Sequence, residues 1–272
     1  MSESASELTA VARRIRGWVL TMSHQAGTPH LGSSLSCADL VAAAYWGGLQ
    51  LDPAHAQSSA RDRFILSKGH AATTLYAALA LKGYFPLEWL NRYAEPGFVL
   101  GEHPSPDIPG IDVATGSLGH GLPVGVGLAL SNRIRGFDNR VCVLMSDGEC
   151  NEGSVWEAAL FAPAHKLSRL MVMIDDNQWQ ATGRSAEITA LQPLAEKWTA
   201  FGWRAVEVDG HDLSTLQRWI SAAPDDGGRP TAIIARTVKG KGVSFMEDDN
   251  NWHYRVPNRD ELARALAELG PT

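Results

Sequence analysis

The chain has 272 residues, of which 44% are hydrophobic and 20% charged, and its formal net charge at pH 7 is −6. This is the composition of a folded globular protein, and it excludes a disordered, collagen-like or coiled-coil chain. The length suits one large α/β domain or two small ones, and the acidic balance argues against non-specific binding to nucleic acid, which needs a basic surface.

Cysteine usage and the lack of long apolar runs bear on the compartment. The three cysteines, Cys37, Cys142 and Cys150, form no C-x-x-C pair, and Cys142 stands in an apolar run typical of a buried thiol. We find no apolar run of the ~18 residues that a membrane span needs. Residues 1–7 lack the basic start and apolar core of a signal peptide. We therefore expect a cytoplasmic protein that binds neither membrane nor nucleic acid.

Amphipathic helices and short apolar strands alternate along most of the chain. The first helix is predicted over residues 8–23, where Leu8, Val11, Ile15 and Val19 share one face. Further helices are expected at 39–46, 71–81, 122–135, 154–166, 191–201, 213–222 and 260–269. Strands are expected at 64–66, 141–145, 170–174, 205–208 and 231–235. Apolar strands separated by crossover helices predict a parallel sheet with helices on both faces, in a single domain over 1–272 with a C-terminal helical tail.

One stretch departs from this alternation. Residues 95–116 hold four prolines and several glycines and show no helical or strand periodicity. Loops of this length inside a compact domain are usually functional.

Polar residues follow every predicted strand. Parallel sheets bind ligands beyond the carboxyl ends of their strands, so these residues are expected to share one edge of the sheet. In chain order they are His70, Asp147, the run 175–177, the run 210–212 and the run 239–242.

Two oxygen donors in this set suggest a metal site. Asp147 leaves one strand, and Asn177 leaves the next, 30 positions later. A carboxylate, an amide oxygen and nearby backbone carbonyls suit Mg²⁺ or Ca²⁺ rather than zinc, and Mg²⁺ usually keeps positions for ligand phosphates. Gly148 and Gly153 let the backbone approach such an anion near a helix start. Either residue alone is typical of a cap or a turn, but the pair at this spacing favours a site for a metal and a diphosphate.

This arrangement resembles the thiamine-diphosphate signature, in which Gly-Asp-Gly is followed at a similar distance by Asn-Asn. Here Ser146 replaces the leading glycine and Asp176 the first asparagine. More closely, the chain resembles the N-terminal domains of the transketolase family. The segments that carry this resemblance are 29–36, 66–71, 101–104, 115–121, 147–157, 175–183 and 239–243. The first reads Pro-His-Leu-Gly where the family usually has Gly-His-Pro-Gly, and His120 stands where glutamine is common, which puts the family's usual sugar phosphates in question.

The resemblance implies a thiamine-diphosphate-binding fold of the diphosphate-domain type and a role for each site residue. Asp147, Asn177 and the carbonyl of Trp179 would hold Mg²⁺, or Ca²⁺, on the cofactor diphosphate. Catalytic roles fall to His30 and His103, facing the thiazolium carbon and the substrate hydroxyls, and to His70. The cofactor would contact His70, Gly116, Ser117, Leu118, Gly148, Glu149, Asn177 and His253. Histidine suits proton transfer near neutral pH.

The resemblance also implies a partner. The family transfers a two-carbon ketol unit from a ketose to an aldehyde, and its activating glutamate lies in a pyrimidine-binding domain that has no counterpart in these 272 residues. Split members of the family pair a short N-terminal subunit with a separate C-terminal one. We therefore expect an N-terminal subunit that works on a sugar or sugar phosphate within an α₂β₂ assembly.

Three alternatives stay open at this point. The chain could serve a deoxyxylulose-phosphate-synthase-like or 2-oxo-acid-decarboxylating enzyme with the same cofactor. It could be a non-catalytic subunit that has kept the cofactor pocket. It could also be a nucleotide-binding dehydrogenase, because Gly119, Gly121 and Gly125 imitate a glycine fingerprint, although no convincing strand precedes them.

Overall fold

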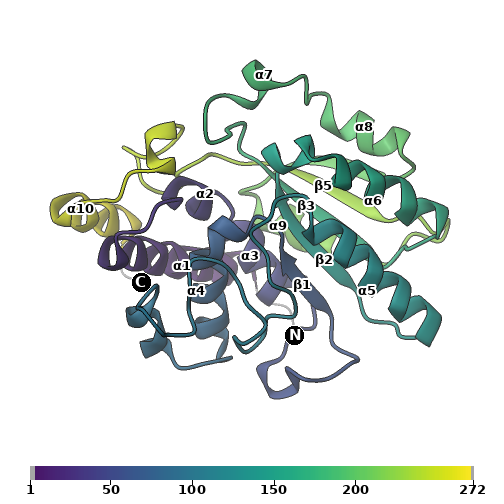
Figure 1. The fold of residues 1–272 in the computed structure, drawn as a ribbon, viewed down its shortest axis with the longest axis horizontal. Helices are drawn as coiled ribbons and strands as arrows, with labels where there is room; N and C mark the ends of the chain where they lie inside the picture. The colour runs from purple at the N-terminus through teal and green to yellow at the C-terminus, as the bar shows by residue number, and fades with distance from the viewer. Residues whose placement is uncertain (1–3, 271–272) are drawn as a thin grey trace.

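In the computed structural model, which describes residues 4–270, five strands form one parallel sheet (Figure 1). They are β1 (Arg63–Leu66), β2 (Val141–Ser146), β3 (Leu170–Asp176), β4 (Arg204–Asp209) and β5 (Thr231–Arg236). Their order across the sheet is β1-β2-β3-β5-β4, and every neighbouring pair is parallel. The five predicted strands are thus confirmed. Residues 1–3 of the acidic N-terminal segment and the last two residues of the predicted domain lie outside the described residues.

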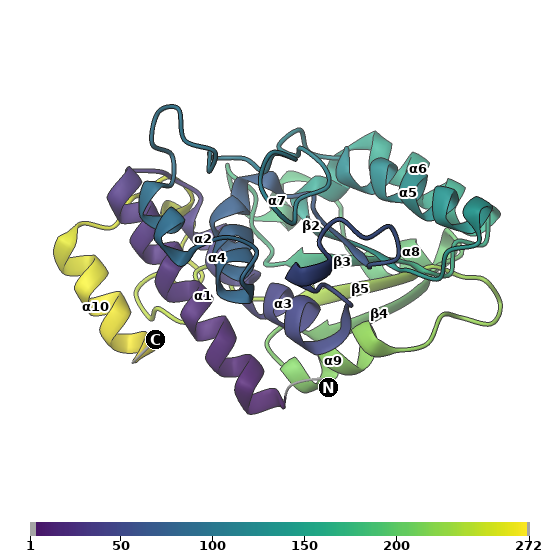
Figure 2. The ribbon, with the colours of Figure 1, turned by 90° about the horizontal axis from the view of Figure 1, so that it is seen from below.

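Helices cover both faces of the sheet. They are α1 (Ala5–Ala26), α2 (Leu31–Ser36), α3 (Ala38–Ala42), α4 (Ala72–Lys82), α5 (Gly121–Arg135), α6 (Gly153–Ala164), α7 (Ser185–Ile188), α8 (Leu194–Ala200), α9 (Leu213–Ser221) and α10 (Arg259–Leu269). Figure 2 shows the sheet between α5 and α6 on one side and α3 and α9 on the other. The predicted tail is α10, which packs against α1.

The alternation of side chains along each strand creates two hydrophobic cores. In β1, Phe64 and Leu66 face a core that contains α1, α3 and α4, whereas Ile65 faces a second core with α5 and α6. Because both faces are covered, β2, β3 and β5 are buried along almost their whole length and read as continuous apolar runs.

Two predicted helices differ from the observed ones. The helix expected at 39–46 is preceded by α2, and the segment from 31 to 48 continues through α3 into a π-helical turn at Ala43–Gly48. The helix expected at 191–201 begins only at Leu194. Proline at 193 has no N–H to donate, and the Gln192 side chain instead accepts a hydrogen bond from the Leu194 N–H at 3.1 Å.

Other expectations from the sequence hold. Residues 95–116 form neither helix nor strand. All three cysteines are free and buried, and burial raises the pKa of Cys142 to about 12. No helix within residues 4–270 is both long and apolar enough to cross a bilayer.

A buried ion pair joins α1 to α3. Asp39 accepts hydrogen bonds from both terminal nitrogens of Arg16, at 3.2 and 2.6 Å, and lies 2.6 Å from Nδ1 of His211. Burial alone would raise the pKa of Asp39, but Arg16 and then His211 outweigh it and lower the pKa to about 2. The charged pair therefore stabilises the fold wherever Asp39 is ionised.

We expect Asp39→Asn to reduce the free energy of unfolding by roughly 3–5 kcal/mol at pH 7, because Arg16 is left buried without its partner. The difference from wild type, measured by urea denaturation, should shrink as the pH falls from about 4 towards 2, since the folded pKa lies below the unfolded value. An equal loss in Asp52→Asn, at an exposed carboxylate, or a pH-independent difference would contradict this.

Candidate active site

A cavity of about 460 Å³ opens where the polar residues after the strands gather. Nine predicted site residues line it: His30, His70, His103, Gly116, Leu118, Gly148, Asn177, Trp179 and His253. The other lining residues are Ser33, Ser146, Asn151, Glu152, Gln180, Ala181, Lys239 and Tyr254. Three predicted residues do not line it. Ser117 is exposed, whereas Asp147 and Glu149 are buried next to lining residues.

The predicted metal ligands come from the ends of neighbouring strands. The Asp147 N–H donates to the Asp175 carbonyl at 3.2 Å, which ties the end of β2 to β3. Asp147 Oδ2 accepts from the Ser185 hydroxyl at 2.6 Å, but Oδ1 is buried and has no hydrogen-bond partner among residues 4–270. Asp147 makes no capping hydrogen bond to the turn that follows it. Burial, followed by the nearby Asp176, raises the pKa of Asp147 to about 7, as expected for a carboxylate without a counter-charge.

Three hydrogen bonds hold the side chain of Asn177. Its Oδ1 accepts from the Trp179 N–H at 3.1 Å, which is the local bond typical of asparagine in a turn. Its Nδ2 donates to Ser36 Oγ at 3.3 Å and to Asp175 Oδ2 at 3.2 Å. The amide is therefore held in one orientation, and Oδ1 keeps a second lone pair for a further contact.

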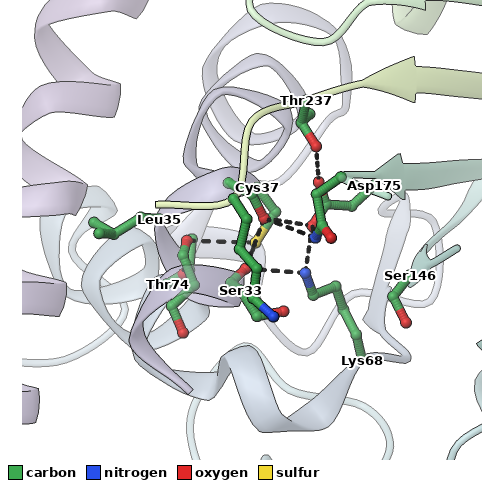
Figure 3. A network of polar contacts seen from close by, with 12 residues as sticks. Ser33, Leu35, Cys37, Lys68, Thr74, Ser146, Asp175 and Thr237 are labelled. Carbon is green, nitrogen blue, oxygen red and sulfur yellow. Dashed lines mark hydrogen bonds and ion pairs between the residues drawn. The ribbon is translucent and has the colours of Figure 1, made fainter. Parts of the chain in front are cut away.

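A fully buried ion pair lies next to this asparagine (Figure 3). Lys68 binds Asp175 and also donates to the Ser33 carbonyl at 2.9 Å. Asp175 further accepts from the Ser36 hydroxyl at 2.6 Å and from Thr237. Burial alone would raise the pKa of Asp175, but Lys68 outweighs it and lowers the pKa. Neither Lys68 nor Asp175 is among the predicted site residues, yet the two join α2 to the ends of β1, β3 and β5.

Glu149 does not line the cavity but holds a nearby turn in place. Its Oε1 accepts hydrogen bonds from the Ser67 hydroxyl and from the Gly119 N–H, the latter at 2.8 Å. The Ser67 hydroxyl in turn accepts from the Gly121 N–H at 3.1 Å. Glu149 thus anchors the glycine-rich turn that carries Leu118 to the ends of β1 and β2.

Three of the predicted histidines form one cluster. The ring centroids of His30 and His70 are 5.4 Å apart, and those of His30 and His253 are 5.1 Å apart. The Ser33 hydroxyl lies 2.9 Å from Nε2 of His70. Burial and then Lys68 lower the pKa of His70 well below its usual range, and burial and then Lys239 lower the pKa of His253 to about 3. Both imidazoles are therefore neutral at pH 7.

Lys239 is a lining residue that sequence reasoning missed. Its side chain is only 1% exposed, and its Nζ donates to Asn250 Oδ1 at 2.6 Å and lies 3.2 Å from Nδ1 of His253. Burial and then Lys68 lower its pKa to about 8. A buried ammonium that lacks a carboxylate partner is suited to an anionic ligand. The run 239–242 was expected at this edge of the sheet, but no individual role was predicted for Lys239.

His103 stands apart from the cluster, at the exposed side of the cavity. The Tyr76 hydroxyl donates to its backbone carbonyl at 2.8 Å. Its ring packs on Gly116, where φ is 142° and an added Cβ would lie 2.8 Å from the imidazole. A side chain at 116 would therefore push His103 out of place, which gives this glycine a positioning role.

Four of the five histidines without a predicted role, all except His120, contact partners outside the cavity. His24 Nδ1 lies 2.7 Å from the Pro257 carbonyl, and His211 is held between Asp39 and the Val238 N–H. His55 contacts the exposed Asp52, and His165 stacks on Phe161. None of the four lines the cavity.

A parallel sheet with a cavity of histidines and a buried ammonium at the carboxyl ends of its strands is the architecture of domains that bind phosphorylated cofactors. The sequence matches the family described as "Transketolase, thiamine diphosphate binding domain" over residues 8–271. The chain therefore belongs to the transketolase family, within its thiamine-diphosphate-binding domain. This excludes the dehydrogenase alternative, in which the glycines would directly follow a strand, whereas here residues 95–120 form no strand.

Two relatives match along nearly their whole length. The chain is 40% identical to the 6-deoxy-6-sulfo-D-fructose transketolase subunit SqwG of a Clostridium species, over 99% of this chain and 98% of that protein. It is 36% identical to a subunit of the apulose-4-phosphate transketolase of Phocaeicola vulgatus, over 99% of this chain and 95% of that protein. Both relatives are named as single subunits of a transketolase.

Longer relatives match over part of their length. The transketolase of Pongo abelii is 37% identical over 96% of this chain but only 42% of its own. The crystal structure of transketolase from Campylobacter jejuni superposes with a TM-score of 0.92 at 25% identity, over 98% of this chain and 43% of that one. The chain thus spans less than half the length of these transketolases.

Proposed function

We propose that the chain is the N-terminal subunit of a two-component transketolase-like enzyme, which binds Mg²⁺ and thiamine diphosphate and transfers a ketol unit with a separate partner subunit. The observation that carries the proposal is the pairing of a buried, unpartnered Asp147 oxygen with Asn177 next to a cavity lined by Lys239 and histidines. Similarity to two transketolase subunits over nearly their whole length supports the two-component arrangement.

The donor set fits a hard divalent cation. The unpartnered Oδ1 of Asp147 is the kind of atom that a bound cation would satisfy, and the family resemblance adds the Asn177 side chain and the Trp179 backbone carbonyl as further oxygen ligands. Two side-chain oxygens and a carbonyl leave positions for phosphate oxygens and water, which is how Mg²⁺ is usually bound. Ca²⁺ would use the same oxygens at longer distances.

Lys239, His70 and His253 would hold the diphosphate. Burial and neighbouring lysines lower the pKa values of Lys239 and His253, and an anion placed among these groups would favour their charged forms. Gly148 lets the backbone approach, and Gly116 and Leu118 line the same cavity. The glycine turn held by Glu149 carries Ser117.

The histidines would handle the substrate's protons. Thiamine diphosphate, when bound, supplies stabilisation of negative charge on carbon. His30 is half-buried, and burial and then His103 lower its pKa, so it is neutral at pH 7 and can accept a proton from a hydroxyl. His103 faces the cavity from the opposite loop and would bind and orient the hydroxyls of a ketose. The relatives' names favour ketose donors over 2-oxo acids.

Calorimetry on the full chain tests the cofactor assignment. Thiamine diphosphate should bind in the presence of Mg²⁺ and not in the presence of excess EDTA. Equal heats in both titrations, or no binding with Mg²⁺ either alone or with the partner subunit, would overturn the proposal. The donor is sought among free and phosphorylated ketoses, including the two named for the relatives.

We expect His103→Ala to lower kcat/KM by ~10²–10⁴, the usual contribution of a general acid–base group, while cofactor affinity stays unchanged. The measurement uses the chain assembled with its partner subunit. His55→Ala is the control, because His55 is an exposed histidine that contacts Asp52 and does not line the cavity. A loss below about threefold in His103→Ala would indicate a structural role instead.

A further inference from the structure

A small hairpin over residues 178–185 lies against the proposed metal ligands. Trp179 pairs with Arg184 as an antiparallel bridge, and the Ser185 N–H donates to the Gln178 carbonyl at 3.0 Å. The two ends of the hairpin touch the ligands. The Trp179 N–H donates to Asn177, and the Ser185 hydroxyl donates to Asp147 at 2.6 Å. The position of the hairpin therefore decides where the proposed ligand oxygens lie.

Asp248, 64 residues after Arg184 in the sequence, binds two side chains of this hairpin. Its carboxylate accepts from both terminal nitrogens of Arg184, at 2.8 and 2.5 Å. The same carboxylate accepts from the indole N–H of Trp179 at 2.8 Å. The Arg184 guanidinium in turn stacks 3.8 Å from the centre of the Trp179 ring. One carboxylate thus holds both strands of the hairpin.

The backbone of Asp248 connects the hairpin to the other side of the cavity. Its N–H donates to the Lys239 carbonyl at 2.8 Å, and its φ of 58° lies in the left-handed region, which aspartate and asparagine tolerate better than most residues. Asn250 makes a second link, donating to the Ala181 carbonyl at 3.2 Å and accepting from Lys239 Nζ at 2.6 Å. Segment 248–250 therefore joins the hairpin to the buried ammonium.

We propose that Asp248 is a positioning residue. Its hydrogen bonds to Trp179 and Arg184 hold the hairpin 178–185 against segment 248–250 and so set the geometry of the metal and diphosphate site. The proposal rests on the proposed function in that Mg²⁺ and thiamine diphosphate are the ligands. The Arg184 and Asp248 side chains are 35% and 55% exposed, and ion pairs this exposed contribute little to overall stability. Their bidentate geometry and their place behind the ligands instead suit an orienting role.

Asp248→Asn is the sharpest test, because asparagine tolerates the same φ and keeps one acceptor for the indole while losing the charged fork. We expect the Kd of thiamine diphosphate in the presence of Mg²⁺ to rise roughly tenfold, the lower end of the range for residues behind a metal ligand. In the cofactor-free chain, amides of residues 178–185 should exchange hydrogen faster, while the urea midpoint is unchanged. Asp225→Asn, which breaks an Arg–Asp pair before β5, is the control and should change neither readout.

A second test combines Asp248→Asn with Arg184→Gln. Because Arg184 and Asp248 act as one unit, the double variant should bind no more weakly than the weaker single variant. Wild-type affinity and exchange in Asp248→Asn, or additive losses in the double variant, would overturn the positioning role. Failure of the wild-type chain to bind the cofactor would instead count against the proposed function, and hydrogen exchange in the cofactor-free chain would still decide whether Asp248 holds the hairpin.

Discussion

Replacing Asp147 or Asn177 with Ala is expected to abolish Mg²⁺-dependent binding of thiamine diphosphate. Each change removes one of the two side-chain oxygens offered to the metal and leaves the charge of the diphosphate only partly neutralised in a partly buried site. The affinity should fall more than roughly a hundredfold, beyond the range for residues that only orient ligands. Calorimetric titration of the full chain with thiamine diphosphate and Mg²⁺ measures the effect.

The stability of the cofactor-free chain separates this role from a structural one. Asp147 Oδ1 has no partner, and burial raises the pKa of its carboxyl, so this carboxylate is costly to bury in the absence of a cation. Asp147→Ala should therefore lose affinity without losing urea resistance. Asn151→Ala is the control within the same cavity, since Asn151 lines it but is not in the proposed donor set. Affinity close to wild type in Asp147→Ala would falsify the metal assignment.

The sheet could be predicted because its strands are buried on both faces. Residues 141–145 and 170–174 read as unbroken apolar runs, which is the pattern that two covering layers of helices produce. The order of the strands could not be predicted in the same way. β5 lies between β3 and β4, and the sequence pattern of β4, which is only partly buried, carries no sign of its place at the edge.

The site could be predicted in part because parallel strands end at one edge. Asp147 and Asn177 are polar residues directly after apolar strands, so their placement at the same edge of the sheet follows from the parallel pairing of β2 and β3. Helix α2 was missed because it is only six residues long and four of them are glycine or serine, which are not strong helix formers, even though all six residues are buried.

The burial of two lysines near the site could not be predicted from the sequence. A lysine in a sequence usually belongs to a solvated surface, yet Lys68 and Lys239 are buried. Their burial depends on Asp175 and Asn250, and Lys68 and Asp175 stand 107 positions apart. The contacts of Asp248 are also distant in sequence, since its partners Trp179 and Arg184 precede it by 69 and 64 positions. Such contacts are created by the packing of loops, which local patterns do not encode.

The isolated chain is expected to be inactive and to become a ketol transferase only with a separate partner subunit. The proposed diphosphate side, with Asp147, Asn177 and Lys239, is present, but the family resemblance places the activating glutamate in the pyrimidine domain. The chain spans 43% of a solved transketolase with which it superposes closely. Large apolar side chains, Ile134 on α5 and Leu160 on α6, are 75% and 61% exposed and are available for contact with another chain. We therefore expect the chain to assemble with a separate partner subunit.

The test is to purify the chain, confirm by mass spectrometry that no partner co-purifies, and assay ketol transfer with Mg²⁺, thiamine diphosphate and a panel of ketoses. Turnover by the chain alone should be undetectable, whereas the assembly should turn over at an ordinary enzyme rate, ~1–10³ s⁻¹.

Leu160→Asp should block recovery of activity by the partner, because a charge would then be buried in the contact, without changing cofactor binding to the isolated chain. The matched change Glu157→Asp, on the same helix, should be silent. Ordinary turnover from the isolated chain would sink the two-component proposal. So would failure of every C-terminal transketolase subunit tried to restore activity on the whole panel.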